Sequence, residues 1–274
     1  MPSPLTKYQR QPKQSIDLPS KGRWYSQGSL EKSEELEVFS MTASNEIATK
    51  TPDTLLSGTT TVDIIKSCIP SIRNPWEIPM TDIYTILAAI RMASYGSSIN
   101  AKNTCTECSE ENNYDIDIQN MLAHFAKGNF EDSVVIDNMK FSVRPLTFKE
   151  LNEINKQNFK LQRTLLQVVP SITDENQRAE EQQKVYDALA VLRKNTVISS
   201  IAKIEVDNEE ETDLNEIAKF IENADKDFFV KVEQAIMRNN EQFIVPDTDI
   251  ECANCGHKSK LNIEMDYSNF FAQG

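Results

Sequence analysis

Four cysteines are the residues of this chain whose type and spacing are best suited to chemistry. They form two Cys-x-x-Cys pairs, Cys105 with Cys108 and Cys252 with Cys255. This spacing lets two thiolates of one tight turn reach the same tetrahedral metal ion, each sulfur lying about 2.3 Å from it. Two pairs supply four ligands, so the sequence predicts one structural Zn²⁺ site with a closed shell.

The same pairs also fit a disulfide framework, a redox centre or buried thiols without metal. A redox Cys-x-x-Cys pair normally opens a helix, whose dipole lowers the thiol pKa. Here each pair is followed by polar residues and then by an alternating segment, 114–118 or 261–265, of the kind that forms a half-buried strand. We therefore favour two strand–turn–strand hairpins that share one ion, which is the arrangement of a zinc ribbon.

Two further residues bear on this ligand set. His257 lies two residues after Cys255 and could replace a sulfur, although a solvated position in the turn is the simpler interpretation. Cys68 lies between Ile65 and Ile69, which is typical of a small core side chain. The predicted metal ligands therefore remain the four paired cysteines.

Patterns that carry catalysis are missing from the sequence. It contains no Gly-rich phosphate loop, no G-x-S-x-G turn and no H-E-x-x-H helix. It has only two histidines, His124 and His257, that could act as a general acid or base. A catalytic zinc is disfavoured as well, because four thiolates leave no position for water. We predict no catalytic residues and a protein that is not an enzyme.

Charge and hydropathy narrow the class of protein further. The 274 residues carry a net charge of −13, with acid concentrated in 205–213 and no cluster of Lys and Arg in the body of the chain. A duplex-binding surface needs such a cluster to displace counterions, so nucleic acid is disfavoured as a partner. No apolar run approaches the ~18 residues of a membrane span, and the polar N-terminus lacks the apolar core of a signal peptide. We expect a protein without a membrane span, made in a reducing cytoplasm.

Hydrophobic periodicity predicts an α+β fold that is mainly helical. Short strands are expected at 36–41, 134–136, 140–143 and 243–245. Helices are expected near 61–69, 81–96, 121–126, 147–169, 174–204, 213–223 and 225–238. The predicted fold thus has small β elements, including a four-cysteine zinc-ribbon-like unit that joins the N- and C-terminal halves. A long helical hairpin, formed by 147–169 and 174–204, is inserted between them.

We divide the chain into four parts. They are a flexible arm at 1–15, an α+β half with the first Cys-x-x-Cys turn at 16–146, a helical region at 147–240, and the second turn with the C-terminal tail at 241–274. The arm carries Lys7, Arg10 and Lys13; it is either a solvated tail or a strap on an acidic neighbour. The tail carries three aromatic residues, Tyr267, Phe270 and Phe271, that either cover the protein's own surface or dock on a partner.

Short motifs give the chain a family resemblance. They are Leu18-Pro19-Ser20-Lys21-Gly22, a strand ending in Met41-Thr42, and a helix ending in Ala93-Ser94-Tyr95-Gly96 directly before the first Cys-x-x-Cys turn. In these features the chain resembles the T4-like bacteriophage baseplate hub and hub-assembly proteins. The resemblance covers about 16–120 and, by analogy, the second turn, whereas 147–240 has no counterpart in it.

The resemblance implies a virion or assembly component of a contractile-tail baseplate that binds other hub and tail proteins. It implies a location in the host cytoplasm during assembly or in the tail baseplate of the virion, and it leaves a homo-oligomer open. The alternative class is a zinc-ribbon regulator that binds nucleic acid; retention on a DNA column that falls steeply with salt would identify it.

Overall fold

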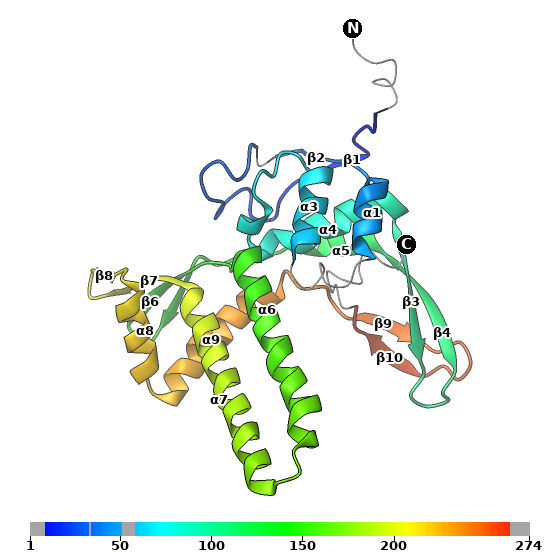
Figure 1. The fold of residues 1–274 in the computed structure, drawn as a ribbon. Helices are drawn as coiled ribbons and strands as arrows, with labels where there is room; N and C mark the ends of the chain where they lie inside the picture. The colour runs from blue at the N-terminus through cyan, green and yellow to red at the C-terminus, as the bar shows by residue number, and fades with distance from the viewer. Residues whose placement is uncertain (1–8, 33, 51–57, 264–274) are drawn as a thin grey trace. The chain divides into compact units, whose positions relative to one another are not determined.

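A computed structural model describes residues 9–32, 34–50 and 58–263 and has an α+β fold (Figure 1). Chain contacts divide it into two compact units. Unit 1 comprises Met1–Asn129 and Gln242–Gly274, and unit 2 comprises Phe130–Glu241. Unit 1 is therefore built from both ends of the chain, and unit 2 is continuous in sequence.

Unit 1 packs short helices together with three two-stranded antiparallel sheets, β1–β2, β3–β4 and β9–β10. Its helices are α1 (Ala43–Thr49), α3 (Thr59–Cys68), the 3₁₀ turn η2 (Pro75–Glu77), α4 (Met80–Tyr95) and α5 (Ile118–Phe125). Its strands are β1 (Gln14–Ile16), β2 (Leu36–Val38), β3 (Ser98–Thr104), β4 (Glu111–Asp117), β9 (Thr248–Glu251) and β10 (Lys258–Leu261). β1 begins inside 1–15, for which the sequence predicts no regular structure.

Helix α4 forms the centre of the unit 1 core. Ile83, Leu87 and Ile90 follow helical spacing and are fully buried, and α4 packs against α3 and α5. The helix ends where Gly96 adopts a φ of 96°, a backbone conformation that glycine takes without steric cost. The sequence prediction of a helix from about 81 to 96 is confirmed, and Thr42 caps the start of α1.

A buried carboxylate fastens the 18–22 turn to α4. Asp82, fully buried in the first turn of α4, accepts hydrogen bonds from the Ser20 backbone N–H at 2.8 Å, the Ser20 hydroxyl and the Tyr25 hydroxyl at 3.1 Å. Lys21 in this turn and Trp24 just after it have positive φ, a costly conformation for side-chain-bearing residues. The Asp82 contacts therefore fix a loop that local preferences alone would not stabilise.

Unit 2 contains one four-stranded antiparallel sheet, in the order β5-β6-β7-β8, with helices that pack on it and on one another. The strands are β5 (Ser133–Ile136), β6 (Met139–Val143), β7 (Ile201–Val206) and β8 (Glu209–Glu211). The helices are α6 (Phe148–Arg163), the π turn η3 (Thr164–Val168), the 3₁₀ turn η4 (Val169–Ser171), α7 (Glu175–Ser199), α8 (Leu214–Asn223) and α9 (Lys226–Glu241). A capping box of Thr147 and Glu150 is present at the start of α6.

The two ends of unit 2 are tied to each other. The Asn239 side chain is buried; it accepts a hydrogen bond from the Glu131 N–H and donates one to the Glu131 carbonyl, both at 2.8 Å. In unit 1, the Asn129 N–H donates to the side chain of Gln242 at 3.1 Å, so the chain leaves and re-enters that unit at one place. Unit 2 is thus an insertion whose first and last segments are held together by hydrogen bonds.

Helices α6 and α7 bury few of their side chains. They pack against each other and run side by side in Figure 1. The buried positions on α6 are Phe148 and Asn152, and those on α7 are Val185 and Val197. Most of this helix pair therefore faces solvent.

Three secondary-structure predictions are wrong. The helix expected over 174–204 stops at Ser199, because the segment 201–206 pairs with β6 as strand β7. No strand forms at 243–245; the strand before the second Cys-x-x-Cys pair is β9. The strand after that pair is β10, not 261–265, and residues 264 and 265 lie outside the described residues.

Burial raises the pKa of the Asp82 carboxyl from 3.8 to about 6, although hydrogen bonds from Ser20, Tyr25 and Thr81 act in the opposite direction. A folded pKa above the unfolded value means that folding takes up a proton. The contribution of this carboxyl to stability is therefore fully present below pH 4 and is lost as the pH rises through about 6.

We predict that the free energy of unfolding of the wild-type chain, relative to Asp82→Asn, falls by up to roughly 3 kcal/mol between pH 4 and pH 6.5. Urea unfolding at a series of pH values measures this difference. Asp63→Asn, which neutralises an exposed carboxylate of α3, is the matched control. Parallel pH profiles for the wild type and Asp82→Asn would contradict the prediction.

Candidate metal centre

Two hairpins of unit 1 carry the four paired cysteines. Strands β3 and β4 pair from Ser98↔Asp117 to Thr104↔Glu111, and the turn 105–110 joins them. Strands β9 and β10 pair from Thr248↔Leu261 to Glu251↔Lys258, and the turn 252–257 joins them. Each Cys-x-x-Cys pair thus lies at the tip of a hairpin, and the two hairpins lie side by side in Figure 1.

The two turns share one backbone conformation. In each, the N–H of the first cysteine donates to the carbonyl five residues later, and the N–H four residues later donates back to the cysteine carbonyl. All four hydrogen bonds measure 2.9 Å; they are Cys105 to Glu110, Ser109 to Cys105, Cys252 to His257 and Gly256 to Cys252. Ser109 and Gly256 both have positive φ. The repeated geometry presents the sulfurs of each pair from the inside of the same tight turn.

The turns bring all four sulfurs together. The Sγ atoms of Cys105 and Cys255 are 3.6 Å apart, those of Cys108 and Cys252 are 3.7 Å apart, and all four lie within 4.8 Å of one another. The edges of a tetrahedron of thiolates at 2.3 Å from zinc would measure about 3.8 Å. The thiols are free, so these distances are not disulfides. The donor set and its spacing therefore fit a tetrahedral ion such as Zn²⁺.

Backbone dipoles favour the thiolate form of Cys252 in this cluster. The N–H groups of Cys255 and Asn254 point at the Cys252 sulfur and, with the Asn112 side chain, lower the pKa of its thiol. Cys105 and Cys252 are buried, whereas Cys255 is exposed. A metal ion would replace the Cys252 proton, which this environment makes easier to remove, and the Cys255 proton, which the neighbouring thiols hold more firmly by raising the pKa of Cys255.

Asn112 joins the two hairpins beside the cluster. This buried residue of β4 donates from Nδ2 to the Cys252 sulfur at 3.4 Å and accepts from the Ala253 N–H at 3.0 Å. Tyr114 adds a hydroxyl hydrogen bond to the Glu251 carbonyl at 3.1 Å. Sequence analysis did not find these residues. Their only signal is that Asn112 occupies a core-facing position in a strand of alternating polarity.

Other residues considered from the sequence lie apart from the cluster. His257 contributes its backbone carbonyl to the turn, and the metal-compatible group found in the described residues contains cysteines alone. Cys68 is buried in α3, and burial raises the pKa of its thiol to about 11. It is a core side chain, as predicted.

Comparison with known protein families identifies the family of this chain. The family described as T4 bacteriophage base plate protein matches residues 15–272, which is nearly the whole chain. This chain belongs to that family. No curated protein and no solved structure matches it. The resemblance drawn from the short motifs is confirmed, and the chain is a structural protein of the phage baseplate.

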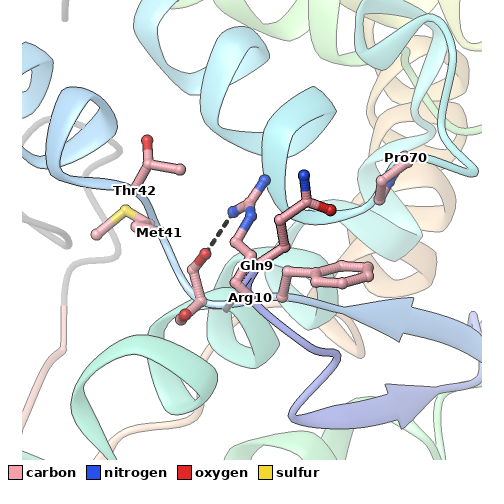
Figure 2. A pocket seen from close by; sticks show the side chains of 7 residues that line it. Gln9, Arg10, Met41, Thr42 and Pro70 are labelled. Atoms are coloured by element: carbon pink, nitrogen blue, oxygen red, sulfur yellow. Dashed lines mark hydrogen bonds between the residues drawn. The ribbon is translucent and has the colours of Figure 1, made fainter. Parts of the chain in front are cut away.

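The baseplate protein also has an open pocket of about 560 Å³ where its N-terminal segment crosses the end of β2 (Figure 2). Arg10 lines this pocket and donates hydrogen bonds to the carbonyls of Ser40 and Ser67. Its guanidinium lies 5.5 Å from the centre of the Phe39 ring. Arg10 thus forms a hydrogen bond near the C-terminal end of α3 in its own chain. Lys7 lies outside the described residues.

In the residues that the structure describes, the baseplate protein has no helix whose length and apolar character would suit a membrane span.

We predict that Asn112→Ala lowers the affinity of the baseplate protein for Zn²⁺ by about 10- to 100-fold, because the loss removes a hydrogen bond that orients a ligand sulfur. Competition with a chromogenic zinc chelator measures the affinity. Asn113→Ala, which changes the exposed neighbour in β4, is the matched control. Equal affinities for the two variants would show that Asn112 does not support the site.

Proposed function

We propose that the chain is a non-enzymatic hub subunit or hub-assembly factor of a contractile-tail baseplate and that it acts by binding other baseplate proteins. The family match supports the baseplate, and the cluster of four thiols supports a protein whose role is structural. The chain would act in the host cytoplasm during assembly or remain in the tail baseplate of the virion.

The ligands of the proposed Zn²⁺ are Cys105, Cys108, Cys252 and Cys255, which would make the two hairpins a zinc-ribbon-like unit. The observation that carries this proposal is the 3.6–3.7 Å spacing between sulfurs of different hairpins. Four thiolates complete the shell, so such an ion would supply stability and leave no position for a reacting water. A closed shell of four thiolates supports a structural metal site rather than a catalytic one.

The proposed protein-binding surface is the α6–α7 pair, which we interpret as the inserted helical hairpin. Phe159 is 50% exposed on α6, Leu166 is 74% exposed on the π turn, and Tyr186 is 48% exposed on α7. Large exposed apolar side chains on helices with few buried positions are typical of an interface that lacks its partner. In the four-part division proposed from the sequence, this pair lies within the helical region 147–240.

We predict one Zn²⁺ per chain by elemental analysis of the purified protein and its loss in Cys252→Ser/Cys255→Ser. Removing the ion should lower the free energy of unfolding by about 4 kcal/mol where free zinc stands 1,000-fold above its Kd. Cys68→Ala, which alters a thiol outside the cluster, should keep its zinc. A wild-type protein without metal, or a double variant that retains it, would refute the proposed site.

We predict that Phe159→Ser/Leu166→Ser weakens co-purification with other baseplate proteins from infected cells by at least about tenfold, since two apolar anchors are lost. Leu214→Ser/Met237→Ser removes two exposed apolar side chains from α8 and α9 and serves as the control. The circular dichroism of both variants should match that of the wild type. Association that is equal in both variants would exclude α6–α7 as the docking surface.

A further inference from the structure

Unit 2 has an apolar hollow between the β7–β8 hairpin and α8. Its volume is about 410 Å³, within the ~300–1,000 Å³ typical of ligand pockets. Figure 1 shows α8 beside these strands. Apolar side chains from two strands and the helix line it: Met139, Ile204, Val206, Ile217 and Phe220. Phe220 is 38% exposed although its ring packs edge to face on Phe228, so an aromatic surface remains open to a ligand.

Carboxylates surround this hollow. The residues that line its rim are Asp207, Glu209, Glu210, Glu211 and Glu216. They include most of the acid in 205–213, a stretch with six acidic residues and no Lys or Arg. An apolar floor under a rim of one charge sign selects a ligand that is apolar in the middle and positive at its ends.

Part of this negative charge has no cationic partner. Glu210 pairs with Lys203, and Glu216 pairs with Lys219 at 2.6 Å. Among the ion pairs of the described residues, none includes Asp207 or Glu209. These two carboxylates are exposed, and the hairpin turn fixes their place, because Asp207 and Asn208 both take the positive φ of a tight two-residue turn. The uncompensated carboxylates therefore stand in a fixed position beside the hollow.

Protection of a sheet edge explains only part of this arrangement. β8 is an edge strand, and charged side chains on such a strand prevent unwanted pairing. That purpose needs neither an apolar hollow on the sheet face nor an exposed phenylalanine on the neighbouring helix. The acidic side chains, the apolar hollow and the exposed phenylalanine together favour a site that binds another molecule.

We propose that this hollow binds a segment of a partner protein in which Lys or Arg residues flank a large apolar side chain. The apolar side chain enters the hollow against Phe220 and Val206, and the flanking cations meet Asp207 and Glu209. The inference rests on the proposed function, since it states the chemistry of one partner of this baseplate protein.

Selection from a random peptide library on the immobilised full-length chain tests the proposal. We expect enriched peptides to carry Lys or Arg on both sides of an aromatic or large aliphatic residue. They should bind at low salt and be released at about 1 M salt, where screening shortens the reach of charges to about 3 Å. Enrichment of peptides without this pattern, or no enrichment, overturns the proposal.

Asp207→Asn/Glu209→Gln should weaken binding of the selected peptides about fivefold by fluorescence anisotropy, since two exposed charge pairs are lost. Asn tolerates the positive φ of position 207, so the turn should persist. Glu175→Gln/Glu180→Gln on α7 removes the same charge elsewhere and should leave affinity unchanged. Equal binding by both variants overturns the proposal. The peptide assay needs no other baseplate protein. It can therefore fail while co-purification through α6–α7 succeeds, and it can succeed while that co-purification fails.

Discussion

The meeting of four thiols from two distant hairpins is the contact on which unit 1 depends. The sulfurs that approach one another are 144 and 150 residues apart in sequence. Closing a loop of that length costs a free chain about 5 kcal/mol of entropy. A structural zinc bound by small domains contributes apparent free energies of about 10–16 kcal/mol, which exceeds this cost. The binding free energy of the proposed ion would thus be sufficient to hold the β9–β10 hairpin against the β3–β4 hairpin.

The same constraint explains how the chain accommodates a large insertion. Asn129 and Gln242 meet at the boundary of unit 1, and Asn239 ties helix α9 to Glu131 at the boundary of unit 2. Each unit therefore closes its own ends with hydrogen bonds. A protein built in this way can carry long helices and an acidic hairpin in the insertion while the zinc-compatible body keeps its fold. Such a division of roles suits a component that must bind several neighbours in an assembly.

Features that depend on local chemistry could be predicted from the sequence. The Cys-x-x-Cys spacing gives each turn its shape, and Thr42 and Thr147 cap their helices through contacts within three residues. The α+β class and the helices α4, α8 and α9 follow from periodicity in the same way.

Features that depend on long-range pairing could not be predicted. The segment 201–206 continues a helical pattern, and only its pairing with β6 makes it a strand. Asp82 looks like an ordinary first-turn acid until Ser20 and Tyr25, about 60 residues earlier, are placed against it. Asn112 likewise gains its position beside Cys252 only from the tertiary fold.

The central claim is that four thiolates of one chain hold a single ion. X-ray absorption at the zinc edge, measured on the purified full-length protein, tests it most directly. The account predicts a first shell of four sulfur atoms at about 2.3 Å. A first shell that contains nitrogen or oxygen, or fewer than four sulfurs, would contradict it.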